Sequence, residues 1–145
     1  MIMLARALDQ STPLLFVDQE KQVILGTPPS KSNCYKIITF KSKDPSKHSH
    51  ASLAKTPALK QYERDFQIQC NKYRNKQIDE YFTIEVDVYY PNQRSDLDNS
   101  AKVILDCLQT VGAISNDNLC TRLVMNKYLD KIHPRIEFII KKSFQ

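Results

Sequence analysis

The segment at residues 81–90, YFTIEVDVYY, limits the possible folds of this chain more than any other stretch. Apolar and polar residues alternate along it, so Phe82, Ile84, Val86 and Val88 share one face. This period of two predicts a β-strand with one buried face, and Pro91 predicts its end. A half-buried strand requires neighbouring strands and a covering layer, so the rest of the chain has to supply both.

Two segments with helical periodicity are suited to form that layer. Thr56 and Pro57 predict the start of the first helix, as a capping residue followed by a favourable first residue. The second helix is expected from about Leu97 to Val111, with Gly112 as its stop. The expected buried stripes are Leu59, Tyr62, Phe66, Cys70 and Tyr73 in the first, and Leu97, Ala101, Ile104, Leu105, Leu108 and Val111 in the second.

Further strands are expected at residues 14–25, 34–40, 119–128 and 132–140. The predicted fold is therefore α+β (mixed α/β), with a mixed sheet of about five strands, two main helices and the order β-β-α-β-α-β-β. The 145 residues are expected to form one domain. Residues 1–12 are interpreted as a flexible N-terminal extension, and residues 41–55 as a mobile basic loop.

The composition favours a cytoplasmic protein without a membrane segment. No apolar run approaches the length of a spanning helix, and the N-terminus lacks the pattern of a signal peptide. The four cysteines lack metal-site spacing and are expected to be reduced and mostly buried. Only two glycines occur, which excludes a P-loop and a dinucleotide-binding fingerprint.

Positive charge is concentrated in one half of the chain. Eleven Lys and Arg residues and only three acidic residues lie between Lys31 and Lys76, although the whole chain has a net charge of +5. This segregation suits a polyanion that contacts the basic half and presents one phosphate to an acidic site. An uneven but unpartnered surface charge remains the alternative, and the 41–55 loop by itself also fits an ordinary solvated loop.

The acidic site is expected directly after the strand at 81–90. Asp96 and Asp98 stand at the start of the second helix, Lys102 lies one turn further on, and Asp117 follows the helix in a polar loop. Carboxylate oxygens are the ligands that Mg²⁺ prefers, and a bound ion can activate water for phosphodiester hydrolysis. The competing interpretation is structural: helix capping by the aspartates, a surface Asp98–Lys102 pair and a turn at Asp117.

The stretch RSDLDNSAKVILDCLQTVGAISNDN resembles the signature of the RusA-type Holliday junction resolvases, a helix of the form R-x-DLDN-x-x-K-x-x-LD-x-L followed by a D-D loop. The resemblance spans roughly residues 22–140. The matching positions are Arg94, Asp96, Leu97, Asp98, Asn99, Lys102, Leu105, Asp106, Leu108 and Asp117. It implies a homodimeric endonuclease that binds four-way or other branched DNA and makes paired nicks with Mg²⁺, for which Mn²⁺ is a potential substitute.

The same resemblance assigns roles to residues. It implies that Asp96, Asp98 and Asp117 are catalytic and bind the metal, and that Lys102 is their basic catalytic partner. The roles of Asn99, Asp106 and Asn116 stay open. Asp106 could orient Lys102, and Asn116 stands where the family usually has a second Asp, which predicts weaker Mg²⁺ binding.

The DNA contacts expected from the basic residues are Arg94, Lys31, Lys36, Lys41, Lys43, Lys72, Arg74 and Lys76. Two rival functions remain beside a junction-resolving nuclease. One is a catalytically weakened protein of the same fold that binds branched DNA. The other is a metal-dependent phosphohydrolase of small nucleotides, which would leave the basic segment unexplained.

Overall fold

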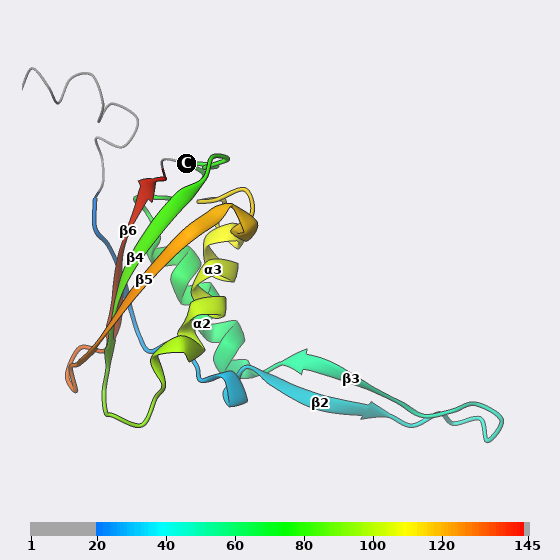
Figure 1. Cartoon of the computed structure of the whole chain (residues 1–145). Helices are drawn as coiled ribbons and strands as arrows, with labels where there is room; N and C mark the ends of the chain where they lie inside the picture. Colours follow the sequence, from blue (N-terminus) through cyan, green and yellow to red (C-terminus); the bar gives the residue numbers. More distant parts are fainter. Residues whose placement is uncertain (1–19, 144–145) are drawn as a thin grey trace, which may run out of the picture.

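The computed structural model describes residues 20–143 and contains a four-stranded sheet, two helices and a separate hairpin (Figure 1). The sheet has the strand order β1-β6-β4-β5. Its strands are β1 (Gln22–Leu25), β4 (Phe82–Tyr90), β5 (Cys120–Leu129) and β6 (Arg135–Lys142). The extension predicted at residues 1–12, and the part of the 14–25 strand before residue 20, lie outside the described residues.

Strand β4 lies inside the sheet, antiparallel to β6 and parallel to β5. Every second residue from Phe82 to Tyr90 is buried, which confirms the alternation seen in the sequence. The buried residues pack against the helices, together with Ile136, Phe138 and Ile140 of β6. The opposite face carries polar pairs, including the Lys141–Glu85 ion pair and an Asn126–Asp87 hydrogen bond.

Helix α2 (Pro57–Gln69) begins as predicted. The Thr56 hydroxyl accepts a hydrogen bond from the Leu59 amide at 3.2 Å, and Pro57 occupies the first helical position. The expected stripe of the first helix is buried, including Cys70 and Tyr73 just beyond its end. Burial of this stripe fixes α2 against the sheet.

Helix α3 (Ala101–Thr110) follows a single 3-10 turn, η3 (Leu97–Ser100). Its buried residues are Val103, Ile104, Cys107 and Leu108, whereas the predicted stripe members Ala101 and Leu105 are only partly buried. The 3-10 turn has three residues per turn, so it shifts the face that a continuous helix from Leu97 would have presented. Gly112, with a φ of 75°, lies just after the helix, as expected for a left-handed stop.

The stretch at 41–55 differs from the prediction of a mobile basic loop. His50–Lys55 form strand β3, which pairs antiparallel with β2 (Tyr35–Phe40), and only residues 41–49 form the connection. The hairpin projects away from the sheet and helices (Figure 1). Its backbone hydrogen bonds come from cross-strand pairing, and its side chains are almost all exposed. The segment therefore lacks the apolar alternation that would have revealed a strand.

The α+β fold class is confirmed, with the element order β-β-β-α-β-α-β-β. The strand beyond the expected order is β3, and the six strands found within residues 20–143 divide into a sheet of four and a hairpin of two. Cys34, Cys70 and Cys107 are buried as predicted, and burial raises the pKa of the Cys107 thiol to about 12. Between residues 20 and 143, no helix is both long and apolar enough to cross a membrane.

Candidate active site

The end of β4 holds the start of the carboxylate motif in place. Tyr90 is fully buried, and its hydroxyl donates to the main-chain oxygen of Asp96 at 3.3 Å and lies 3.2 Å from the Ser100 hydroxyl. From β5, the Lys127 ammonium donates to the carbonyls of Ser95 and Gln93. Two strands of the sheet therefore anchor the 91–100 segment, which positions Asp96 and Asp98 relative to α3.

A cleft of about 880 Å³ lies between α3 and the base of the hairpin. One wall comes from η3, α3 and the loop that follows; the other comes from the start of α2 and the strand ends at Tyr35 and Lys55. The first wall contributes Asp98, Asn99, Lys102, Val103, Asp106, Gln109, Thr110, Asn116 and Asp117. Most of the candidate catalytic residues thus line one cavity, and Asp96 is not among the residues that line it.

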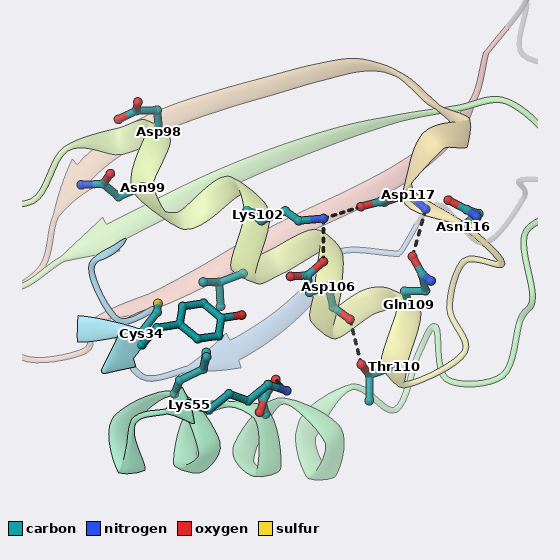
Figure 2. Close-up of a pocket in the computed structure, with 14 residues that line it drawn as sticks. Cys34, Lys55, Asp98, Asn99, Lys102, Asp106, Gln109, Thr110, Asn116 and Asp117 are labelled. Carbon is teal, nitrogen blue, oxygen red and sulfur yellow. Dashed lines mark hydrogen bonds and ion pairs between the residues drawn. The ribbon is translucent and has the colours of Figure 1, made fainter. Parts of the chain in front are cut away.

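Lys102 bridges two carboxylates of this cleft (Figure 2). Its ammonium lies 2.7 Å from Oδ2 of Asp117 and 2.9 Å from Oδ1 of Asp106. The hydrogen bonds to Asp117 and Asp106 raise the pKa of Lys102 well above its ordinary value. The Lys102 side chain is 71% exposed, so solvent screens both pairs and they contribute little to stability. Their main effect is to place a positive charge beside two carboxylates that face the cleft.

Two contacts that a purely structural role would require, a capping bond from Asp96 and an Asp98–Lys102 pair, are not formed. Asp96 precedes η3 but makes no side-chain capping hydrogen bond. Lys102 pairs toward the C-terminus of α3 with Asp106 and Asp117, and Figure 2 shows Asp98 turned away from this cluster. The surface Asp98–Lys102 pair is therefore replaced by a contact across 15 residues of sequence.

The loop after α3 is held by two amide side chains. Asn116 accepts a hydrogen bond from the Asn118 amide at 3.0 Å and caps the 3-10 turn η4 (Asp117–Leu119). Gln109 of α3 accepts from the Asp117 amide at 3.1 Å. Since Asn116 performs the capping, the Asp117 carboxylate is directed to Lys102 instead of to the turn. Asn and Asp are about equally good caps, so Asn116 preserves the geometry of this loop.

The donor chemistry of the cleft suits a hard divalent cation, since its acidic side chains offer only carboxylate oxygens. Asp98 and Asp117 line the same cavity. The side chains do not converge on one point, however. Within residues 20–143 no three His, Cys, Asp or Glu residues lie close enough to hold a metal ion together. The oxygen donors fit Mg²⁺ by type, but in the described residues they are not gathered around one point.

The predicted DNA contacts fall in several regions. Lys36, Lys41 and Lys43 are exposed on the hairpin, and Arg94 is exposed in the turn before the motif. Lys72, Arg74 and Lys76 follow the other end of α2 and do not line the cleft. The prediction for Lys31 concerns a side chain that lies outside the described part of the structure.

Several residues of this site were not identified from the sequence. Gln109, Lys127 and Tyr90 were given no role from the sequence. Tyr35, Lys55 and Glu63 reach the cleft only because the hairpin base packs beside α2. Only Tyr90 could have been identified from the sequence, because it continues the alternation of buried residues in β4 up to the last residue before Pro91.

Comparison with known proteins identifies one family. The family model described as Endodeoxyribonuclease RusA matches residues 39–141. The matched region starts at the end of β2 and includes both helices, η3 and the loop that carries Asp117. No curated protein matches the chain.

Replacement of Asn116 tests the role of this side chain as a cap. Asn116→Ala removes the acceptor for the Asn118 amide and is expected to lower the free energy of unfolding by about 1 kcal/mol. Asn116→Asp keeps the acceptor and is expected to leave stability within about 0.5 kcal/mol of the original chain. Urea unfolding followed by circular dichroism measures both. Equal stability of the alanine variant and the original protein would refute the capping role.

Proposed function

Because the match covers more than half of the chain, this protein belongs to the RusA endodeoxyribonuclease family, whose members act on branched DNA junctions, and we propose that it resolves four-way junctions by Mg²⁺-dependent hydrolysis of paired phosphodiester bonds in DNA recombination and repair. The observation that carries this proposal is that Lys102 bridges Asp106 and Asp117 in a cleft that Asp98 also lines. Free nucleotides as the substrate would leave the family match and the basic hairpin unexplained.

In this proposal Asp98 and Asp117 would hold Mg²⁺, with Asp96 as a third ligand, and Mn²⁺ would be able to substitute for it. When bound, the ion activates a water molecule and offsets the charge that develops on the phosphate oxygens. Lys102 contributes a fixed positive charge next to Asp117, where it contacts the scissile phosphate. Tyr90 and Lys127 hold the main chain around Asp96 and thereby fix where the motif lies relative to α3.

Asp106 acts on Lys102 and not on the metal in this scheme. Any cation that binds Asp117 competes with the Lys102 ammonium for that carboxylate. Asp106 lies one turn after Lys102 on α3, so it offers the ammonium a second partner that persists when Asp117 is engaged elsewhere. We therefore assign Asp106 as a positioning residue for Lys102.

The exposed hairpin supports both DNA binding and a homodimer. Lys41, Lys43 and Lys47 stand at its exposed end, where they can contact phosphates. Ile37 and Leu53 are directly paired and 72% and 71% exposed, which is unusual for apolar side chains on a monomer surface. Two symmetric cuts require two sites, which a two-fold dimer provides. A sedimentation mass of one chain at all concentrations would rule out the dimer.

One observation favours a second candidate, a catalytically weakened protein that binds branched DNA. The proposed ligands Asp96, Asp98 and Asp117 do not form a closed metal-binding group in the described structure. This candidate predicts tight binding of a synthetic four-way junction without any nicking in Mg²⁺ or Mn²⁺. Cleavage by the original chain decides for the nuclease.

Removal of the proposed ligands tests the nuclease directly. Asp96→Asn and Asp117→Asn are each expected to lower cleavage of a synthetic four-way junction in Mg²⁺ by more than about 100-fold. Loss of a residue that only supports a metal ligand already costs roughly 10–100-fold, and loss of a ligand should cost more. Junction binding is expected to stay equal or tighten, because each change removes negative charge near DNA. Asp79→Asn, in an exposed loop outside the cleft, is the matched control and should cleave normally. Preserved cleavage by both site variants would contradict the metal assignment.

A double-mutant cycle separates positioning from metal ligation at Asp106. Asp106→Asn is expected to weaken Mn²⁺ binding several-fold, measured by electron paramagnetic resonance, because Lys102 then pairs with Asp117 alone. In the Lys102→Met background, the same change is expected to alter Mn²⁺ binding by less than about twofold, since solvent screens the partly exposed Asp106 carboxylate. An equal loss in both backgrounds would instead make Asp106 a ligand. Lys102→Met alone should reduce cleavage much more than junction binding.

The salt dependence of binding tests the hairpin lysines. Simultaneous replacement of Lys41, Lys43 and Lys47 by Ala is expected to reduce the slope of log affinity against log salt by about 1 for each lysine that contacts a phosphate. Lys131→Ala, in the exposed turn between β5 and β6, serves as the control and should leave the slope unchanged. An unchanged slope in the triple variant would show that the hairpin faces away from DNA.

A further inference from the structure

The proposed chemistry uses only one wall of the cleft. The opposite wall is formed by Cys34, Tyr35 and Lys55 at the base of the hairpin and by Leu59 and Glu63 of α2. Figure 2 shows Lys55 on this α2 side, across the cavity from Asp117. A strand whose scissile phosphate contacts Lys102 at the first wall therefore has its neighbouring nucleotide facing this second wall across the cavity.

The size of the cleft limits what can enter it. Its volume of about 880 Å³ falls within the range of roughly 300–1,000 Å³ that is typical of pockets for single small ligands. A DNA duplex, whose major groove alone is about 12 Å wide, is much larger. Only part of one strand fits inside the cleft, so a nucleotide that enters it has to leave its base pair. Unpairing costs least where pairing is already disrupted, as it is at a branch point.

The second wall offers the groups that bind a nucleotide. Tyr35 lines the cleft and is 48% exposed, which leaves part of its ring available for stacking. Tyr35 pairs directly with Lys55 across the hairpin, so both side chains lie on the same face. Glu63 holds the Lys55 ammonium at 2.8 Å, and this hydrogen bond raises the pKa of Lys55. An aromatic face and a protonated amine thus stand side by side.

Hydrogen bonds at the base of the hairpin fix the positions of Tyr35 and Lys55. The Thr56 amide donates to the Cys34 carbonyl at 2.9 Å, and its hydroxyl donates to the Asn33 carbonyl at 2.5 Å. Thr56 also caps α2. Thr56 therefore connects the start of β2 and the end of β3 to the start of α2, the helix that contributes Leu59 and Glu63 to this wall.

We propose that Tyr35 and Lys55 form a subsite for a single unpaired nucleotide next to the scissile phosphate, with the base stacked on the Tyr35 ring and its phosphate bound to Lys55. The subsite rests on the proposed function and adds to it a physical basis for selecting branched over fully paired DNA. A continuous duplex cannot present such a nucleotide without breaking a base pair.

A cycle between the ring and the base tests this subsite. Four-way junctions are prepared with a base or an abasic spacer at each position flanking the branch point, and binding is measured without divalent metal. For the original chain, the spacer at the bound position is expected to lower affinity on the order of tenfold, as expected for loss of one stacked base. Tyr35→Ala is expected to show the same loss with the intact junction and no further loss with the spacer.

Two variants complete the design. Tyr35→Phe keeps the ring and is expected to behave as the original chain. Tyr81→Ala removes a similarly exposed tyrosine outside the cleft and should have no effect. The fluorescence of a 2-aminopurine base at the same position should be quenched when the original chain or Tyr35→Phe binds, and not when Tyr35→Ala binds.

The outcomes separate the subsite from the proposed function. An abasic effect of equal size in the original chain and in Tyr35→Ala, or no abasic effect at any flanking position, would overturn the subsite while junction cleavage in Mg²⁺ stands. Absence of junction cleavage by the original chain would instead count against the proposed function. Quenching and non-additivity at one position would establish the subsite whatever the cleavage rate.

Discussion

The hydrogen bonds of the buried Tyr90 hydroxyl are the interaction on which the arrangement of the site depends. They connect the last buried residue of the central strand to the Asp96 main chain and to Ser100, the last residue before α3. A buried hydroxyl requires a partner, so this contact is costly to lose. Because the core fixes the position of β4, this contact also fixes the position of the carboxylate motif that follows the strand. Lys127 adds a second tie from the neighbouring strand.

The remainder of the site follows from how α3 ends. The helix closes at Gly112, and the chain returns so that Asp117 lies beside Lys102, where Gln109 and Asn116 hold the loop. The positive charge in this acidic cleft belongs to Lys102, a side chain of the same helix. This arrangement keeps Lys102 in contact with two carboxylates before any cation or DNA is bound, and it gives Asp106 a role through Lys102.

Local patterns predicted those elements whose partners are close in sequence or whose burial shows as a period. The alternation in β4, the Thr56–Pro57 start of α2 and the stop at Gly112 are of this kind. The face of α3 was partly wrong because a 3-10 turn shifted its phase, and β3 was missed because its stability comes from pairing with β2. Gln109, Lys127 and Tyr35 carry no local signal, since each acts on a residue far away in sequence.

The amino-acid sequence by itself determined the fold class, the spacing of the DLDN-x-x-K motif and the family, because these depend on periodicity and on the order of residue types. Only the tertiary structure decided which partner Lys102 takes, that Asn116 caps the loop, and that the hairpin base forms the second wall of the cleft. The physical reason is that hydrogen bonds and cavities depend on distances between side chains that the packing of α2, α3 and the sheet sets. Asp96 illustrates the division: its place in the motif is local, whereas its position outside the cleft lining is a property of the packed structure.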